Sequence, residues 1–477
     1  MRLVASAFCS FQLAPWAFAQ VVQWDIKHQF STSGLRRRSD LSFEAVLENR
    51  RARGGYYATV EVGNPHQEIT LQIDTGSSDT WIPFQDADIC TNDSSRSRGC
   101  CLGSFNPTES SSFSLVGQNM FDITYADDSY SRGDYFEDDF RISGMEITNM
   151  TMGLGLRSSI PHGLLGIGYA SNEASIHTAN VMYPNLPIAM EQAGLVNTVA
   201  YSLWLNDLGA SYGNILFGGV DTAKYIGNLT IIDLLPDQRT QNFTQFAIPI
   251  TSLEASSPTG NDILSSQEMP VEAVLDSGTT LTYMPNDLAQ LIWDEVGAVY
   301  DSSYDLAVLP CSYGTHKGHF SFGFAGPSGP HINIAMDELV IDLTDGSPPR
   351  FSNGPYRGKR TCVCGFQNLT SGPYVLGDSF LRSAYVVFDL INHQVAIAPT
   401  DFNATRTEII TFESRGATIP SATVAPSQGE RVHIPQTPRS SLSAAEGFQS
   451  NASRSYGLSS VTLAVLSLAV GLAWTAT

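Results

Sequence analysis

One short motif centred on an aspartate occurs twice in this chain, and the repeat constrains the fold more than any other feature. Residues 71–83 read LQIDTGSSDTWIP, and residues 271–285 read VEAVLDSGTTLTYMP. In each copy an apolar strand runs directly into an aspartate, Asp74 or Asp276, followed by a hydroxyl residue and a glycine. A single copy would mean little, because aspartates often cap turns by accepting bonds from backbone amides two residues on.

Each copy is followed by a matching apolar segment later in the chain. Leu-Leu-Gly stands at 164–166, and Val-Leu-Gly stands at 375–377. A repeat of this kind indicates two similar halves built from the same unit. We therefore expect each half to bring one carboxylate to a shared place.

Composition favours a large, mostly β protein. The chain has 477 residues, of which 42% are hydrophobic, enough for a sizeable core and for more than one folding unit. Aromatic and β-branched residues recur in short runs that Gly, Pro, Asn and Ser interrupt, which is typical of many short strands. Residues 286–300 give the clearest helical pattern.

The formal net charge is −21, and the body carries no basic stripe. This excludes a nucleic-acid-binding protein that relies on neutralising phosphates. The excess of carboxylates serves solubility. It also suits an acidic compartment, where many carboxylates are neutral and repel one another less.

The first 53 residues have the features of segments that are removed during secretion. Residues 1–19 combine a short apolar stretch with a final Ala-Phe-Ala, which predicts a signal peptide. Residues 20–53 carry seven basic and four acidic side chains, with arginine clusters at 36–38 and 50–53. We expect a basic propeptide that covers an acidic cleft and is cut by a processing protease at these clusters. A flexible linker is the alternative.

Sequons of the form Asn-x-Ser/Thr behind a signal peptide indicate glycosylation outside the cell. Seven occur, at Asn92, Asn149, Asn228, Asn242, Asn368, Asn403 and Asn451.

The cysteines outside the signal peptide are even in number, which fits disulfide bonds in an oxidising compartment. The six candidates, for which fifteen pairings are open, are Cys90, Cys100, Cys101, Cys311, Cys362 and Cys364. A zinc site would need a second cysteine pair and histidines at finger spacing, so we expect no metal and no cofactor.

The end of the chain predicts a lipid anchor. Residues 401–451 lack apolar periodicity and are rich in Ser, Thr and Pro, which indicates a disordered, O-glycosylated stalk. Residues 461–474 are apolar but too few to span a bilayer comfortably, and no basic residues follow them. Together with small residues at Asn451 they match a GPI signal, so we expect lipid attachment there and removal of residues 452–477. A transmembrane helix is the alternative.

Five motifs resemble those of the pepsin-like aspartic proteases in content and order, and the ends of the chain resemble the GPI-anchored yapsin-type members of fungi. The motifs are YYATVEVGNPHQEITLQIDTGSSDTWIP, FDITYADDSY, GLLGIGY, VLDSGTTLTYMP and VLGDSFLRSAYVVFDLINHQVAIAP. The resemblance implies a bilobal acid protease fold of two similar β lobes, at 54–230 and 231–400, with the active cleft between them. We expect a monomer.

The resemblance also implies that Asp74 and Asp276 hydrolyse peptide bonds as a pair. Two carboxylates about 3 Å apart do not both ionise, so they share a proton. The pair then supplies a base that activates water and an acid that protonates the carbonyl oxygen and the leaving amine. The supporting residues that the resemblance implies are Thr75 and Ser277, which cross-link the loops, Gly76 and Gly278, which allow close approach, and Ser77 and Thr279, which bond the outer carboxylate oxygens.

A flap over the cleft is implied as well, carrying Tyr125, with the indole N–H of Trp81 donating to its hydroxyl. The family's flap usually reads Tyr-Gly-x-Gly, whereas this chain reads Tyr-Ala-Asp-Asp at 125–128. The loss of two glycines should stiffen the flap tip or change its turn type. Asp127 and Asp128 predict that the pocket before the scissile bond accepts Lys or Arg as well as hydrophobic residues. The alternative is that both are solvated turn acids.

By the same resemblance, Cys90 pairs with Cys100 or Cys101 and Cys311 pairs with Cys362, and the partners of the other two stay open. The chain is thus expected to be an acid endopeptidase that acts on polypeptides at the cell surface. A freely secreted nutritional protease and a catalytically silent, protease-like binding glycoprotein are the alternatives. Both Asp-Thr/Ser-Gly motifs are intact, which favours an enzyme.

Overall fold

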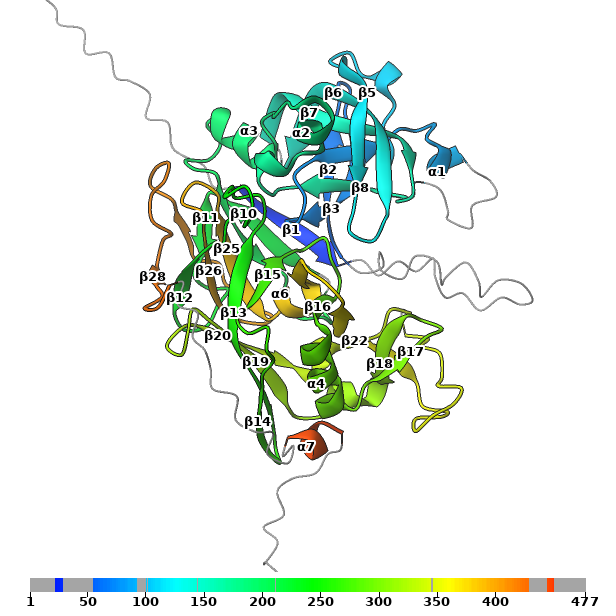
Figure 1. Ribbon diagram of the computed structural model, residues 1–477. Helices are drawn as coiled ribbons and strands as arrows, with labels where there is room; N and C mark the ends of the chain where they lie inside the picture. Colours follow the sequence, from blue (N-terminus) through cyan, green and yellow to red (C-terminus); the bar gives the residue numbers. More distant parts are fainter. Residues whose placement is uncertain are drawn as a thin grey trace, which may run out of the picture.

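The computed structural model describes residues 22–28, 55–91, 100, 102–143, 145–210, 212–344, 346–428 and 444–449, and of 22–28 the backbone alone. Two β lobes lie end to end, with the blue and cyan first lobe above the green and yellow second lobe in Figure 1. One sheet of fourteen strands begins in the first lobe and continues between the lobes into the second. In sheet order its strands are β28 (Ala422–Val424), β12 (Leu229–Asp233), β26 (Gln394–Pro399), β25 (Ala384–Asp389), β9 (Ala200–Trp204), β10 (Gly213–Phe217), β1 (Val22–His28), β2 (Tyr56–Val62), β3 (Gln67–Asp74), β8 (Gly163–Gly166), β4 (Thr80–Pro83), β7 (Met145–Ser158), β6 (Tyr130–Ile142) and β5 (Ser114–Thr124).

The second lobe adds an eight-stranded sheet, a four-stranded sheet and a two-stranded ribbon. The strands of the eight-stranded sheet are β20 (His331–Ala335), β19 (His319–Phe324), β13 (Ala247–Ser257), β14 (Gly260–Leu264), β15 (Val271–Leu275), β24 (Tyr374–Leu376), β16 (Thr282–Pro285) and β23 (Phe366–Leu369). The others are β17 (Val299–Asp301), β18 (Leu306–Pro310), β22 (Thr361–Cys364) and β21 (Val340–Ile341), and the ribbon β11 (Gly219–Asp221) with β27 (Ile409–Thr411).

The helices are short and few in the described part of the chain. They are α1 (Asp88–Thr91), α2 (Ala174–Ala179), α3 (Leu186–Gln192), α4 (Asn286–Val296), α5 (Met336–Leu339), α6 (Asp378–Leu381) and α7 (Ala445–Gln449). None of these described helices has the length and hydropathy that a membrane crossing requires. The mostly β, bilobal fold expected from the sequence is therefore confirmed.

The internal repeat of the sequence is a repeat of structure. In the first lobe β3 leads into Asp74 and pairs in parallel with β8, which carries Leu-Leu-Gly. In the second lobe β15 leads into Asp276 and pairs in parallel with β24, which carries Val-Leu. Parallel strands of this kind are covered on both faces, which fits β8, whose four residues are all buried, and β15, of which only Glu272 is exposed.

Both glycines of the repeated Leu-Gly pattern sit where the backbone of the aspartate loop passes. A side chain on Gly166 would reach within 2.6 Å of the backbone nitrogen of Asp79. A side chain on Gly377 would overlap the carbonyl oxygen of Leu281. Asp79 and Leu281 each lie five residues after the aspartate of their own half. The two halves therefore use a glycine at equivalent points for the same close approach.

The longest helix, α4, follows from its apolar spacing. Leu288, Ile292 and Val296 recur every four residues and are buried in the core of the second lobe. The helix ends at Val296 because Gly297 adopts the left-handed conformation, with φ of 70°. The sequence prediction of a helix over 286–300 is thus right in place but too long, and the next residues start β17.

The predicted propeptide contributes a strand to the central sheet. The backbone of β1 pairs antiparallel with β10 from Val22 to Ile26, and with the start of β2 at Lys27 and His28. Figure 1 shows this blue strand between the two lobes rather than over either one. Residues 22–28 therefore form part of the sheet, and a propeptide that covers the cleft stays a prediction. Residues 1–21 and 29–54 lie outside the described part, as do the signal peptide and both arginine clusters.

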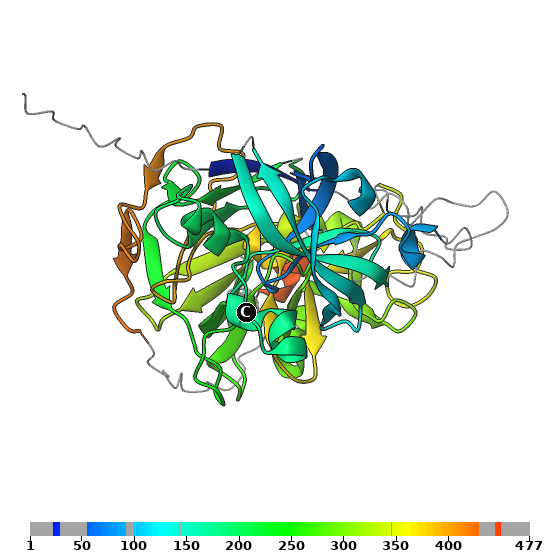
Figure 2. The ribbon, with the colours of Figure 1, turned by 90° about the horizontal axis from the view of Figure 1, so that it is seen from above.

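The folded body extends past the predicted lobe boundary at residue 400. Within the predicted stalk, β27 pairs with β11, and β28 pairs in parallel with β12. Figures 1 and 2 both show this brown segment running along the outer side of the second lobe. Residues 401–428 are therefore part of the body and not a disordered stalk.

A second part of the predicted stalk, α7, docks on the second lobe. The Phe448 ring is fully buried and stacks on Phe320 at 5.1 Å between ring centroids. The amide of Gln449 donates to the carbonyl oxygens of Asp294 and Glu295 at the end of α4. This helix lies just before Asn451, and Asn451 and the predicted GPI signal at 452–477 lie outside the described residues.

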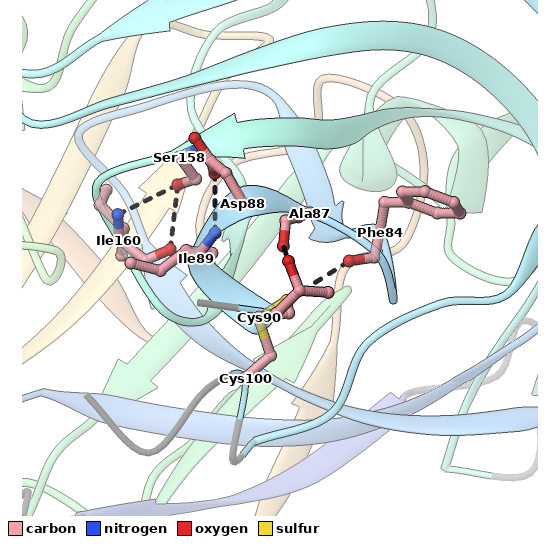
Figure 3. Close-up of a disulfide and its surroundings, with 9 residues drawn as sticks. Phe84, Ala87, Asp88, Ile89, Cys90, Cys100, Ser158 and Ile160 are labelled. Atoms are coloured by element: carbon pink, nitrogen blue, oxygen red, sulfur yellow. Dashed lines mark hydrogen bonds between the residues drawn. A yellow bond between two sulfur atoms is a disulfide. The ribbon is translucent and has the colours of Figure 1, made fainter. Parts of the chain in front are cut away.

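Two disulfides join described residues. Cys90 of α1 bonds Cys100, and Asp88 of the same helix accepts from the Ser158 amide at 3.0 Å (Figure 3). Cys311 bonds Cys362 and ties the four-stranded sheet to the segment after β18. Both pairings are among those that the resemblance implies. Cys364 is buried and not disulfide-bonded, so its candidacy as a disulfide partner is wrong, and Cys101 lies outside the described residues.

Candidate active site

The carboxyls of Asp74 and Asp276 are held by mirrored sets of hydrogen bonds. Each aspartate sits at the end of its strand, and its Oδ1 accepts from the amide of the glycine two residues on, Gly76 or Gly278, at 2.8 Å. The strand fixes the backbone and the turn fixes the side chain. Both carboxyls therefore have one defined orientation before any substrate arrives.

A hydroxyl three residues after each aspartate bonds the other carboxyl oxygen. Ser77 donates to Oδ2 of Asp74, and Thr279 donates to Oδ2 of Asp276 at 2.6 Å. Hydrogen bonds to a carboxylate favour its ionised form, so these contacts oppose the effect of burial. The contacts match those that the resemblance implies for Ser77 and Thr279.

The two aspartate loops grip one another through Thr75 and Ser277. The amide of Thr75 donates to the Ser277 hydroxyl at 3.2 Å, and the amide of Ser277 donates to the Thr75 hydroxyl at 2.9 Å. Each hydroxyl in turn donates to a strand carbonyl of the opposite lobe, Leu275 or Ile73. Both side chains are buried. The lobes are thus joined by four hydrogen bonds directly behind the carboxyls.

The glycines of the two loops let the carboxyls approach. A side chain on Gly76 would reach within 2.5 Å of Asp276, and a side chain on Gly278 would overlap Asp74. No other residue fits at either position without moving an aspartate.

Burial first, and then the adjacent charge of Asp276, raises the pKa of Asp74 well above its ordinary value. Asp74 is only 4% exposed. A raised pKa next to a second carboxyl is what two acids in contact must show, because they do not both carry a charge at close range. The arrangement can therefore hold one proton between two carboxyls near neutral and acidic pH.

Tyr125 and Trp81 stand beside this pair in a small aromatic cluster. The Trp81 indole N–H donates to the Tyr125 hydroxyl at 2.8 Å, as the resemblance implies. Trp81 is fully buried against Phe121 and Leu164, and Tyr125 packs on the same cluster from the end of β5. Tyr125 begins the tight turn that joins β5 to β6, so this hairpin is the predicted flap.

The flap tip is a turn closed by its own residues. The amide of Asp128 donates to the Tyr125 carbonyl oxygen at 3.0 Å, and Asp128 adopts the left-handed region with φ of 64°. One carboxylate oxygen of Asp127 accepts from both the amide and the hydroxyl of Ser129. Aspartate tolerates the left-handed region better than most residues, which is how the turn forms without the family's second glycine. Both acids are exposed.

Several buried polar groups near the pair were not singled out from the sequence. Asp79 accepts from the hydroxyls of Tyr135 and Tyr183, each at 2.8 Å, and from the Ala174 amide. Burial raises its pKa. Its place in the Asp-Thr-Gly-Ser-Ser-Asp run is a signal that a second acid belongs to this loop.

Below the loops, α6 presents Asp378, and burial raises its pKa while the nearby Arg382 guanidinium opposes that shift. Arg382 is itself buried and bonds the Glu338 carboxylate and carbonyl oxygen. The amides of Asp378 and Ser379 donate to the carbonyls of Thr279 and Thr280. These contacts support the Asp276 loop from beneath.

The sequons divide into accessible and less accessible positions. Among the described ones, Asn149, Asn228, Asn242 and Asn403 are exposed. Asn368 is half-buried, and its amide donates to Asn286 at 2.9 Å. Asn92 lies outside the described residues.

Comparison with known proteins agrees with this geometry. Residues 55–400 match the family model described as eukaryotic aspartyl protease. The chain is 39% identical to the probable aspartic-type endopeptidase opsB of Aspergillus oryzae, over 84% of this chain and 81% of the relative. It is 33% identical to secreted aspartic protease 8 of Candida albicans, over 73% and 76%, and 29% identical to aspartic proteinase yapsin-3 of Saccharomyces cerevisiae, over 82% and 74%.

The fold is similar to the crystal structure of the aspartic proteinase from Irpex lacteus, with a TM-score of 0.57 at 18% identity over 81% of this chain and 100% of that chain. This second similarity supports the fold alone. The family model spans well over half of this sequence, and the opsB relative matches this chain along 81% of its own length. The chain therefore belongs to the eukaryotic aspartyl proteases and is an aspartic-type endopeptidase.

Proposed function

We propose that Asp74 and Asp276 are the catalytic dyad and that the enzyme hydrolyses peptide bonds at acidic pH. The observation that carries the proposal is the pair of mirrored aspartate loops, with each carboxyl bonded by a glycine amide and by a hydroxyl, and the two loops gripping one another. The raised pKa of Asp74 supports a shared proton. General acid–base chemistry at one peptide bond needs one proton donor and one acceptor, and the dyad supplies both.

In the proposed reaction the ionised carboxylate takes a proton from a water molecule, whose oxygen attacks the peptide carbonyl carbon. The protonated carboxyl gives its proton to the carbonyl oxygen, which makes a neutral tetrahedral intermediate. Collapse of this intermediate breaks the C–N bond: the carboxyl that took the proton from water gives it to the leaving amine, and a hydroxyl of the intermediate returns a proton to the other carboxylate, which restores the dyad. Because the two carboxyls titrate as one unit, the proton belongs to the pair.

The test is cleavage of a denatured protein by mature enzyme purified from cells, followed between pH 3 and pH 7 with and without pepstatin. We expect pepstatin-sensitive cleavage that is strongest below pH 6. Mature, folded protein without activity anywhere between pH 3 and 6 would overturn the proposal and favour the silent binding glycoprotein.

We further propose that the flap acids extend the specificity of the enzyme to Lys and Arg before the scissile bond, alongside hydrophobic residues. One carboxylate oxygen of Asp127 is occupied by Ser129 within the turn, and its second oxygen accepts no bond from another described residue. That oxygen is available to a cationic side chain beneath the flap. The effect requires the flap to close over substrate, because exposed ion pairs contribute only about 0 to 1 kcal/mol.

We propose that the protein is secreted and held at the outer cell surface by a GPI lipid at Asn451. The name of one relative, secreted aspartic protease 8, supports a place in or beyond the secretory pathway. Residues 1–19 and 452–477 supply the matching signals in the sequence. Phosphatidylinositol-specific phospholipase C should release the enzyme from cells, whereas mature protein that retains residues 461–474 would favour a membrane helix.

Processing at the arginine clusters is proposed to activate a precursor that is latent near neutral pH. Basic side chains in 20–53 pair with ionised carboxylates at pH 7, and protonation of those carboxylates weakens the pairs. The ladder between β1 and β10 consists of backbone bonds that do not titrate, so acid alone does not free residues 22–28. The mature chain should begin after Arg38 or within 50–53, and a mature chain that begins at Gln20 would contradict the proposal.

Glycosylation and a monomeric state complete the proposal. The exposed sequons at Asn149, Asn228, Asn242 and Asn403 are the suitable acceptors, and the occupied amide of Asn368 makes it the poorest of those described. Site-resolved mass spectrometry after glycosidase treatment and sedimentation of the deglycosylated protein test the two claims.

A further inference from the structure

A buried glutamine interrupts the apolar strand that leads to Asp74. In β3 the side chains of Leu71 and Ile73 point into the core, so Gln72 lies on the opposite face, the one that also carries Asp74. Gln72 is only 6% exposed. A buried amide costs free energy unless its donors and acceptor are bonded, so its partners indicate why it is there.

The Gln72 amide joins a histidine of the first lobe to the second aspartate loop. Its nitrogen donates to the carbonyl oxygen of Gly278 at 3.0 Å, and its oxygen lies 3.0 Å from Nε2 of His162. Because the Gly278 carbonyl can only accept, the amide orientation is fixed, and His162 must carry its proton on Nε2. His162, Gln72 and the Gly278 carbonyl thus form one hydrogen-bonded series that crosses from the first lobe to the second.

This hydrogen-bonded series ends at Gly278, a residue whose position affects both carboxyls. Gly278 donates its own amide to Asp276 and lies so near Asp74 that a side chain on it would overlap the carboxyl. A glycine has no side chain to restrict its backbone, so an external bond to its carbonyl restrains a residue that is otherwise free to rotate. Holding the Gly278 carbonyl thus holds the amide that orients Asp276.

This hydrogen-bonded series has no counterpart at the equivalent strand position in the other half of the repeat. The residue two positions before Asp276 is Val274, which has no side-chain donor. The grip between Thr75 and Ser277 is reciprocal, whereas the bond from Gln72 runs in one direction, from the first lobe to the loop of Asp276. The similarity of the two halves therefore does not explain the glutamine at position 72, because the equivalent position of the second half has valine.

We propose, on the basis of the proposed dyad, that Gln72 and His162 are positioning residues for Asp276, acting through the Gly278 carbonyl. His162 orients the amide and Gln72 orients the loop. The assembly is closely covered, since a side chain on Gly55 would come within 2.8 Å of the Gln72 amide nitrogen, and the Tyr57 ring lies edge-on to His162 at 5.3 Å between centroids.

The charge state of His162 gives the proposal a second observable. Burial lowers the pKa of His162 to about 4, and no charged side chain contributes to this shift. Tyr57 is the one titratable group among the ring and hydrogen-bond partners described for it, and Gln72 is neutral. The imidazole is therefore neutral above pH 5, and below pH 4 a buried cation forms next to the Gln72 amide. The second proton enters on Nδ1 and leaves the Nε2–H bond to Gln72, so we expect positioning to fail in acid because the buried cation moves toward water.

The test compares kcat and KM of wild type, Gln72→Met and Gln367→Met at pH 5. Gln367 is a matched control, because it is a buried glutamine of β23 whose amide bonds the backbone at Ala307 and Cys364, within the second lobe. We expect about a tenfold lower kcat with KM within twofold for Gln72→Met, which loses the bond to His162 and the bond to the Gly278 carbonyl that orients a reacting group. Gln367→Met should lose stability and keep kcat.

The histidine arm uses His162→Gln, which keeps a donor, and His162→Leu, which does not. His162→Gln should keep most of kcat and move the acid limb of the kcat profile to lower pH, whereas His162→Leu should lower kcat. If Gln72→Met fails to fold, these two variants still decide the matter.

The two proposals fail separately. The dyad would be overturned if no preparation of the folded wild-type enzyme cleaves peptides, or if Asp74→Asn keeps its activity. Wild-type activity that depends on Asp74, with kcat within twofold of wild type in Gln72→Met and in His162→Leu, would overturn the positioning role and leave the dyad standing.

Discussion

The side-chain hydroxyls of Thr75 and Ser277 each accept a hydrogen bond from the backbone amide of the other residue, at 2.9 and 3.2 Å. The bonds cross from one lobe to the other directly behind the candidate catalytic carboxyls. The relative position of Asp74 and Asp276 is thereby fixed by groups that belong to different halves of the chain.

Replacing Thr75 with valine should damage activity more than stability. The change keeps the shape of the side chain but leaves the buried Ser277 amide without its acceptor, at a cost of about 1 to 3 kcal/mol. We expect kcat/KM to fall by at least about tenfold at pH 4 to 5, because the carboxyls lose their alignment. Thr251→Val is the matched control, since Thr251 is a buried threonine bonded to Gly323 and Gly326 within the second lobe. Equal kcat/KM losses in the two variants would contradict a catalytic role for the grip.

The flap acids should change what is cleaved. Asp127→Asn keeps the bonds to Ser129 but removes the charge, and Asp128→Asn keeps tolerance of the left-handed turn. We expect each variant to lower the ratio of cleavage after Lys or Arg to cleavage after Leu, by up to about tenfold for the stronger of the two. A peptide library cut at pH 5 measures the ratio. An unchanged ratio in both variants would remove these acids from the account of specificity.

Stability should fall as pH rises from acid to neutral. Burial and the neighbouring Asp276 raise the pKa of Asp74, and burial raises the pKa of Glu173 to about 9. A carboxyl whose pKa is higher in the folded than in the unfolded protein stabilises the fold below the unfolded value, and this contribution is lost as pH rises through the folded value. Glu173→Gln should therefore raise Tm at pH 8 and leave it nearly unchanged at pH 4.

The control for that measurement is Glu61→Gln, because Glu61 is an exposed glutamate on β2. If Glu173→Gln lowers Tm at pH 8 as much as at pH 4, Glu173 is ionised in the folded protein and the sign of the prediction is wrong.

The docked tail should contribute to the stability of the second lobe. A variant that ends after residue 450 keeps α7, whereas one that ends after residue 428 removes the buried Phe448 ring from Phe320. The single change Phe448→Ala should cost about 3 to 5 kcal/mol, as for other buried phenylalanines. We expect thermal unfolding to place the 450 variant near the full-length protein and the 428 variant clearly below it. Equal Tm values would mean that α7 does not dock in solution.

Much of the site could be predicted from the sequence because the repeat is local. Asp74 and Asp276, with the glycines and hydroxyls beside them, lie within a few residues of each other in each copy, and their bonds run mainly within the turn. The contact between Trp81 and Tyr125 came from the resemblance and not from spacing. Its basis is that the strand after the first loop faces the flap hairpin.

Other features depended on contacts between distant residues. Phe448 is a lone aromatic residue in a polar stretch, and its partner Phe320 is far away in sequence, so no periodicity indicates the packing. The strand at 22–28 did carry a signal, since Val22, Trp24 and Ile26 alternate with polar residues, but the charge pattern of the longer segment outweighed it. Gln72 was equally visible as a polar residue within an apolar run, although its partners were not.

The central claim is that two carboxyls share the chemistry, and the most direct measurement is kcat/KM of Asp74→Asn and of Asp276→Asn for one peptide at pH 4, with circular dichroism to verify folding. Asparagine keeps the volume and the hydrogen-bonding oxygen but can neither give nor take the shared proton. The account predicts that each variant folds and loses at least about 10³-fold in kcat/KM. A folded variant of either kind that keeps a tenth of wild-type kcat/KM would contradict it.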